Sequence, residues 1–117
     1  NFIHQGVDIK NAERLRIELG WSIRIFSSAI RISNSSYVRY KKELKLLNTT
    51  LSENIFEVAK TCYFCLDYFE NIERFNIWLN TPSLQFDSKK PLTFIDTIAG
   101  REFIKNTVNR LKYAYNA

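Results

Sequence analysis

The stretch Trp78–Gly100, WLNTPSLQFDSKKPLTFIDTIAG, contains both prolines of the chain and one of its three glycines. Proline is accepted in the first turn of a helix but stops a helix that precedes it, and glycine allows close contact where helices meet. Pro82 therefore predicts the end of one helix, and Pro91 predicts the start of a short helix of one or two turns. Gly100 predicts close packing against the last helix. We interpret the segment as one that shapes a docking module and has no part in catalysis.

The composition favours a helical fold with a substantial core. The chain has 117 residues, of which 45% are apolar and 15% aromatic, with only three Gly and two Pro. A chain of this size forms one domain, or two very small ones. An all-β fold needs frequent turns, so the scarcity of Gly and Pro argues against it. We therefore predict an all-α protein.

Apolar residues recur at intervals of three and four through most of the chain, which is the spacing of a helix face. Expected helices cover residues 11–19, 23–30, 34–44, 71–80, 91–97 and 101–115, and a long helix lies within residues 47–70. Gly20 is expected to end the first helix, and Ser22 and Ser33 to cap the next two. The long helix is capped either by Asn48, or by Thr50 in a capping box with Glu53. The polar loop at residues 83–90 is expected to be held by Leu84 and Phe86.

The first half of the chain carries the whole excess of positive charge. Residues 1–50 hold nine Lys and Arg against four Asp and Glu, a net charge of +5, while residues 51–117 hold eight of each. A basic half suits a polyanion such as DNA. A solvated basic face is the alternative, and charge alone does not separate the two.

Three short helices with a tight turn between the second and third predict a helix-turn-helix unit. In DNA-binding units of this type, the second helix of the motif reads base edges and basic side chains hold the phosphates. Tyr37 and Tyr40 are expected to face the core. A helical hairpin with a basic surface is also a common structural motif, so that interpretation stays open. The candidate DNA-binding residues are Arg31, Asn34, Ser35, Ser36, Val38, Arg39, Lys41 and Lys42.

The cysteines and the histidine offer no chemical site. Cys62 and Cys65 lie in the middle of a predicted helix on its apolar stripe, where two thiols behave as small buried hydrophobes. A structural zinc site needs four ligands, and His4 is far away in the sequence. No glycine-rich phosphate loop and no catalytic triad can be assembled. We predict no enzyme, no metal and no cofactor.

No stretch is apolar enough to span a membrane, and we find no secretory signal. Two cysteines without a disulfide framework favour a reducing compartment. These features predict a cytoplasmic protein without a membrane partner.

The order of short motifs in the second half resembles the antitoxins of the Xre/MbcA/ParS type, which pair with RES-domain toxins. The family carries a tryptophan-leucine-x-threonine-proline block, a proline-leucine pair, a threonine-x-x-glycine block and a closing arginine-aliphatic pair. The residues that match the first three blocks are Trp78, Leu79, Thr81, Pro82, Pro91, Leu92, Thr97 and Gly100, and Arg110-Leu111 matches the last. In the front half, LRIELGWS and IRISNSSYVRYKK resemble the Xre-like unit.

The resemblance implies an all-α fold in which an Xre-like helix-turn-helix region, residues 1–46, packs onto a helical toxin-binding domain, residues 47–117. It also implies a function: the antitoxin binds a RES toxin that consumes or uses NAD, covers its active site, and represses its own operon through DNA. The implied partners are the cognate toxin and operator DNA, and the implied assembly is a homodimer or a larger complex with the toxin. The implied toxin contacts are Arg110, Lys112, Tyr113, Tyr115, Asn116 and Ala117.

The chain departs from the family pattern at three places where glycine is usual. Arg31 stands in the turn of the helix-turn-helix, Asp87 and Ser88 stand in the loop before Pro91, and Ala114 stands near the end. A left-handed conformation costs a residue other than glycine about 1–2 kcal/mol. The rival function, a DNA-binding regulator with an accessory helical dimerisation region, rests on the basic front half.

Overall fold

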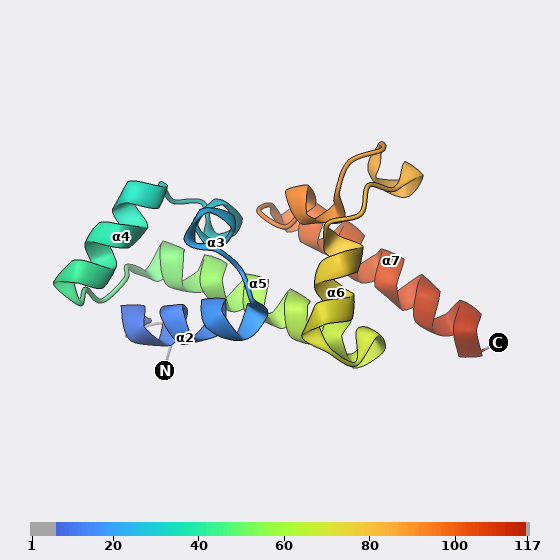
Figure 1. Cartoon of the computed structure of the whole chain (residues 1–117), viewed down its shortest axis with the longest axis horizontal. Coiled ribbons are helices and arrows are strands. Elements are labelled where there is room, and N and C mark those ends of the chain that lie inside the picture. The colour runs from blue at the N-terminus through green and yellow to red at the C-terminus, as the bar shows by residue number, and fades with distance from the viewer. Residues whose placement is uncertain (1–6, 117) are drawn as a thin grey trace. The chain divides into compact units, whose positions relative to one another are not determined.

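The computed structural model describes the backbone of residues 7–116 and the side chains of residues 7–114. Within that range the protein is all-α, and its only extended pairings are two isolated bridges, Asp8 with Leu46 and Ser83 with Lys89. The described residues form six α-helices and two 3-10 helices in chain order (Figure 1): α2 (Ile9–Leu19), α3 (Ile23–Ile30), α4 (Asn34–Glu43), α5 (Thr49–Phe69), α6 (Ile72–Leu79), η1 (Leu84–Phe86), η2 (Pro91–Phe94) and α7 (Ile98–Asn116).

The chain forms two compact units, and the boundary lies inside α5, between Ala59 and Lys60. Unit one contains α2, α3, α4 and the first half of α5. Unit two contains the second half of α5 and everything after it. Each unit has buried apolar residues of its own. No helix in the described range is both long enough and apolar enough to cross a bilayer.

The short helices of unit one begin at polar caps. The side chains of Asp8, Ser22 and Ser33 accept hydrogen bonds from the backbone N–H groups of Lys10, Ile25 and Ser36, respectively. These bonds satisfy donors that the first turn of a helix leaves free. The predicted caps Ser22 and Ser33 are confirmed.

The same three helices each end at a left-handed residue. Gly20, Arg31 and Leu44 have φ values of 70°, 68° and 51°. The backbone N–H of Arg31 donates to Ser28 and that of Ile32 donates to Ser27, which is the double hydrogen bond of a Schellman ending. Arg31 therefore adopts the conformation for which glycine is usual, and the tight turn between α3 and α4 is preserved.

Aromatic packing fills the core of unit one. Phe26 and Tyr37 are fully buried, and their rings meet edge to face with centroids 5.6 Å apart. The ring centre of Trp21 lies 6.4 Å from that of Phe26. Tyr37 is thus inward as predicted, whereas Tyr40 is only half-buried. The core fixes α4 through its Tyr37 face and leaves the opposite face open.

Asn48 caps α5, because its side-chain oxygen accepts from the N–H of Leu51 at 2.8 Å. The alternative cap, Thr50 with Glu53, is wrong: Thr50 already lies within the helix. Inside the first turn, the Ser52 hydroxyl accepts from the N–H of Val7 at 2.8 Å. This buried contact ties the start of α5 to the segment that precedes α2.

Unit two is built around the second half of α5 and the length of α7. Its buried apolar side chains include Cys62, Cys65, Phe75, Leu79, Phe86, Ile95, Ile104 and Val108. Helix α7 begins at Ile98, three residues earlier than predicted, because the threonine-x-x-glycine block belongs to its first turn. The predicted helix at Pro91 is a 3-10 helix of four residues.

The loop between α6 and η2 differs from the prediction at one position. Phe86 is 1% exposed and holds the loop, as expected. Leu84 was expected to help hold it, and that expectation is wrong, because its side chain is 89% exposed. The 3-10 turn at Leu84–Phe86 turns these two side chains in different directions, since Phe86 alone reaches the aromatic cluster of the unit.

Candidate functional site

The end of α6 is closed by hydrogen bonds from the block that contains Pro82. The hydroxyl of Thr81 donates to the carbonyl of Ile77 at 2.6 Å, and its backbone N–H donates to Trp78 at 3.2 Å. The helix has already ended at Leu79, so the exposed Pro82 comes three residues after the last helical residue and no backbone donor is lost to it. Threonine and proline together therefore fix where the chain leaves α6.

The start of α7 is fixed by Thr97 and Gly100. The hydroxyl of Thr97 accepts from the N–H of Gly100 at 2.9 Å, which is an N-terminal cap. A Cβ atom on Gly100 would lie only 1.8 Å from the carbonyl oxygen of Phe94. Glycine is required there because no side chain fits between α7 and η2. The close packing predicted at Gly100 is confirmed.

Arg101 is a structural contact that the sequence did not reveal. Its side chain is only 6% exposed, and its guanidinium donates to the carbonyl of Ile95 at 3.1 Å. Ile95 is the residue directly after η2, so the bond clamps the first turn of α7 onto that short helix. The only signal in the sequence is the position directly after Gly100.

A chain of aromatic rings connects the helices of unit two. Trp78 on α6 lies 5.3 Å from Phe69 on α5 and 5.8 Å from Phe86 in the loop. Phe86 in turn lies 5.1 Å from Phe94 and 4.9 Å from Phe103 on α7. Such tilted and edge-to-face pairs stabilise beyond their buried area. The rings thus join α5, α6, η1, η2 and α7 into one scaffold.

The eight signature residues therefore serve mainly as scaffold. Leu79, Pro91 and Gly100 are buried, Trp78 and Leu92 are half-buried, and Thr81, Pro82 and Thr97 are exposed at helix ends. They lie at the C-terminal end of α6, at the N-terminal end of α7 and in η2. Their arrangement sets the direction in which α7 leaves the scaffold.

The last turns of α7 present the side chains predicted to bind a toxin. Arg110 is exposed, and Tyr113 is 70% exposed. The backbone of Tyr115 and Asn116 continues the helix, but their side chains and the whole of Ala117 lie outside the described residues, as does His4. Arg110 and Tyr113 thus form an open surface at the end of a helix whose beginning is firmly held.

Lys112 differs from its neighbours because it is engaged within the unit. Its ammonium donates to Asp67 at 2.8 Å and lies 5.5 Å from the ring centre of Phe64, both on α5. The Lys112 ammonium lowers the pKa of the Asp67 carboxyl. Lys112 therefore ties the end of α7 to α5 instead of projecting freely.

In unit one the candidate DNA-binding face is the exposed side of α4. Asn34, Ser35, Val38, Arg39 and Lys42 are exposed. Ser36 is half-buried, because it belongs to the cap and its hydroxyl accepts from Ser33 at 2.8 Å. Arg31 is exposed at the turn that precedes the helix.

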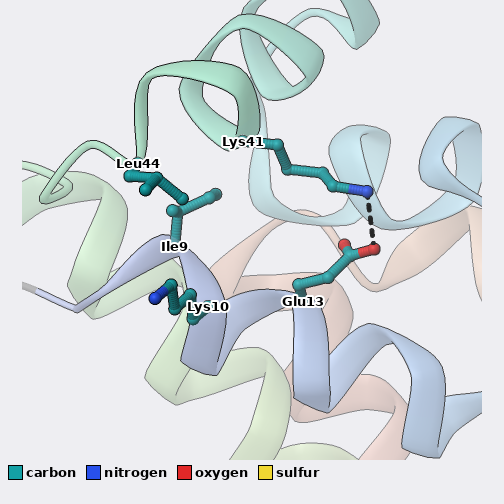
Figure 2. A pocket seen from close by; sticks show the side chains of 5 residues that line it. All are labelled: Ile9, Lys10, Glu13, Lys41 and Leu44. Carbon is teal, nitrogen blue, oxygen red and sulfur yellow. Dashed lines mark hydrogen bonds and ion pairs between the residues drawn. The ribbon is translucent and has the colours of Figure 1, made fainter.

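Lys41 is the candidate DNA contact whose side chain turns toward α2 and away from the exposed face of α4. Its ammonium donates to Glu13 on α2 at 2.9 Å, in a small open pocket of about 180 Å³ that Ile9, Lys10 and Leu44 complete (Figure 2). Figure 2 shows Lys41 reaching down from α4 toward the carboxylate on α2. This ammonium orients the helix and is not displayed beside Arg39.

Glu13 is the charged centre of unit one, and its side chain is 17% exposed. Arg16 donates to both of its oxygens, and Tyr37 donates to Oε2 at 2.7 Å. The Arg16 guanidinium, with the Tyr37 hydroxyl and the Lys41 ammonium, lowers the pKa of Glu13 to about 2 against the opposing effect of burial. Burial and the bond to Glu13 raise the pKa of Tyr37. The network holds α4 on α2.

The two cysteines are buried, as predicted, and their thiols have low reactivity. Both are fully buried, and burial raises the pKa of Cys62 and raises that of Cys65 to about 12. A thiol with a raised pKa is a poor nucleophile and a poor ligand. Among residues 7–116 no group of three or more His, Cys, Asp and Glu is placed to hold a metal ion.

Comparison with protein families identifies the second half of the chain. Residues 66–114 match the model of the antitoxin Xre/MbcA/ParS C-terminal toxin-binding domain. The resemblance drawn from the motifs is thereby confirmed over this segment, which carries every signature residue. A search of curated proteins gave no match to the chain. Residues 66–114 are thus similar to a domain by which antitoxins of this type bind a toxin.

Proposed function

We propose that the protein neutralises a RES-domain toxin by covering the entrance of its active site with the last turns of α7. The support is the pairing of a matched toxin-binding segment with an open end of α7. RES toxins resemble ADP-ribosyltransferases and use NAD, so a blocked entrance would stop the reaction. The toxin contacts proposed are Arg110, Lys112, Tyr113, Tyr115, Asn116 and Ala117.

The chemistry of this end suits such a role. Tyr113 offers a large, rigid aromatic surface, and exposed arginine can form two hydrogen bonds with one carboxylate. The scaffold of unit two fixes the direction of α7 before binding. A surface that is already ordered loses less entropy when it docks.

The deciding experiment is coexpression with a toxic RES-domain protein. The full chain should restore growth, and deletion of residues 110–117 should abolish rescue while leaving the helical circular dichroism spectrum nearly unchanged. NAD consumption by the purified toxin gives the same comparison in vitro. A truncated chain that protects as well as the full chain would refute occlusion by α7.

A second activity, repression of its own operon, is supported by the exposed basic residues of α4. Arg39 and Lys42 lie on the open face of a helix that the Glu13 network orients, in the half of the chain with a net charge of +5. We propose that residues 1–46 are a helix-turn-helix region and residues 47–117 the toxin-binding domain. Arg31, Asn34, Ser35, Ser36 and Val38 complete the proposed DNA surface, with Lys41 acting mainly through Glu13.

DNA binding is tested with a duplex from the upstream region at several salt concentrations. Neutralising phosphates releases counterions, so affinity should fall steeply with salt. Arg39→Ala combined with Lys42→Ala should lower the affinity and the salt dependence together. Sedimentation of the free protein and of its mixture with toxin tests the proposed dimer and the larger complex. Absence of DNA binding at low salt would leave toxin neutralisation as the sole function.

A further inference from the structure

The loop between α6 and η2 displays the most exposed large apolar side chain among the described residues. Leu84 is 89% exposed, more than Ile98 at 80% or Tyr113 at 70%. A single leucine on a surface is common and carries no functional meaning alone. What calls for an explanation is how thoroughly the backbone around Leu84 is organised.

Ser83 stabilises the loop through hydrogen bonds made by its backbone N–H, its carbonyl and its hydroxyl. Its N–H donates to Lys89 at 3.2 Å, its carbonyl accepts from Phe86 at 3.0 Å and from Ser88 at 2.9 Å, and its hydroxyl accepts from the N–H of Gln85 at 3.2 Å. Phe86 is buried among Trp78, Phe94 and Phe103. The hydrogen bonds of Ser83 therefore close the loop, and the buried ring of Phe86 anchors it to the aromatic cluster.

Two consecutive residues in this loop adopt left-handed backbone conformations without being glycine. Asp87 has φ 56° and Ser88 has φ 63°. Such conformations carry a steric cost for residues with a Cβ atom, and they persist where the surroundings enforce them. Figure 1 shows the loop as the orange segment between α6 and α7. The chain thus bears a local cost to hold a turn whose apolar member points into solvent.

We infer that Leu84 is a second anchor for the toxin. Its side chain would insert into an apolar pocket of the toxin that has an acidic rim. The inference rests on the proposed function, and it assigns a contact separate from the end of α7. An ordered aliphatic side chain on a closed loop buries its whole surface on docking with little further loss of entropy.

The charge around Leu84 favours a different protein over a second copy of this chain. Lys89 and Lys90 are both exposed at the end of the loop, and Asp87 is the only acid between residues 83 and 90. A twofold contact would set this surface against itself and bring two net-positive loops together. An acidic rim on the toxin would instead attract the lysines and steer the leucine toward its pocket.

The test measures the affinity of full-length Leu84→Asn for a catalytically inactive variant of the RES-domain toxin that the unmodified chain neutralises. Asparagine has a similar size but loses the apolar contact, so binding should weaken by about 10- to 100-fold. The thermal midpoint of the free protein should not change, because the side chain is already in water. Charge reversal of Lys89 and Lys90 together should slow association by about tenfold at low salt and much less at high salt.

Two control variants separate a specific anchor from a sticky surface. Gln85→Ala alters the neighbouring exposed position of the same turn, and Leu46→Asn alters a leucine in unit one that is 64% exposed. Both should bind the toxin within twofold of the unmodified chain. Equal weakening by Leu46→Asn would overturn the inference, because the loss would then be generic.

The remaining outcomes distinguish this inference from the proposed function. Unchanged toxin affinity in Leu84→Asn would overturn the second anchor and leave occlusion by α7 intact. The same unchanged affinity, accompanied by conversion of a dimer to a monomer, would show that a second copy occupies the loop. Failure of the unmodified chain to bind the toxin would refute the proposed function and this inference together.

Discussion

The turn at Arg31 in unit one and the junction at Gly100 in unit two solve different problems at a helix end. Arg31 adopts a left-handed conformation at φ 68° although it has a side chain, which points into solvent. Gly100 lies inside the first turn of α7, and a Cβ atom there would lie 1.8 Å from the Phe94 carbonyl. The first problem is a modest backbone strain, and the second is a steric exclusion. We expect their substitutions to differ in sign as well as in size.

The largest effect is expected from Gly100→Ala. The new methyl group must displace the backbone of η2, because Phe94 meets it with a carbonyl and not with a flexible side chain. We expect a loss of about 3 kcal/mol, at the upper end of overpacking effects, and a fall in thermal midpoint of roughly 10 °C. Ala99→Gly, at the exposed position beside it, should cost only about 1 kcal/mol. A midpoint within 2–3 °C of the unmodified chain, on the order of measurement scatter, would contradict this packing at Gly100.

The next effect concerns pH and Glu13 in unit one. The pKa of Glu13 is lowered from 4.5 to about 2, so its carboxylate stabilises the fold fully above about pH 4.5 and loses that contribution as the pH falls toward 2. The stabilisation at neutral pH is about 2–3 kcal/mol. Glu13→Gln should remove most of it and flatten the acid limb of the stability curve, measured by urea unfolding between pH 2 and 7.

Glu43→Gln is the control for that experiment, because Glu43 is exposed at the end of α4. It should change the free energy of unfolding by less than about 0.5 kcal/mol at neutral pH. If Glu13→Gln and Glu43→Gln have the same acid limb, the network around Glu13 does not hold α4 in the way described.

Arg31→Gly should be stabilising, in contrast to Gly100→Ala. Glycine relieves the left-handed strain but adds freedom to the unfolded chain, so the net gain is about 0.5–1 kcal/mol. Gly20→Ala, where φ is 70°, should lose about 1 kcal/mol for the same reason in reverse. Thermal midpoints of both variants provide the measurement. Equal destabilisation by the two would contradict the strain at Arg31.

The smallest effect is expected from Asp67→Asn, which removes the partner of Lys112. The pair is largely exposed, so the thermal midpoint should stay within experimental error. Amide exchange in the last two turns of α7 should become faster, because the end of the helix loses its tether to α5. Exchange rates that do not change would show that the pair contributes nothing to the order of that end.

Local sequence signals predicted much of the fold. Ser22 and Ser33 were recognisable as caps because a hydroxyl before an apolar run satisfies the free donors of a first turn. Gly20 and Pro82 were recognisable as helix ends for equally local reasons. The tight turn at Arg31 was expected from the motif, although its left-handed backbone could not be read from an arginine. The start of α7 was missed because the cap Thr97 precedes a glycine, which disfavours a helix unless packing requires it.

The candidate site was predictable only in part, because partners of charged side chains come from distant segments. No acidic residue three or four positions away in the sequence identifies a partner for Lys41 or Lys112. The structure places Glu13, from α2, beside Lys41 and Asp67, from α5, beside Lys112. Arg110 and Tyr113, whose surroundings are mainly solvent, are exposed as expected of a contact surface.

The sequence by itself determined most of the helices, the caps at Ser22 and Ser33 and the breaks at its prolines, because each depends on hydrogen bonds and dihedral angles within a few residues. The tertiary structure alone decided that Leu84 points outward while Phe86 points inward, and that Lys112 pairs with Asp67. Those outcomes depend on which surfaces meet across long separations in the chain. Burial and charge pairing depend on both of the surfaces in contact, and no short stretch of sequence contains both surfaces.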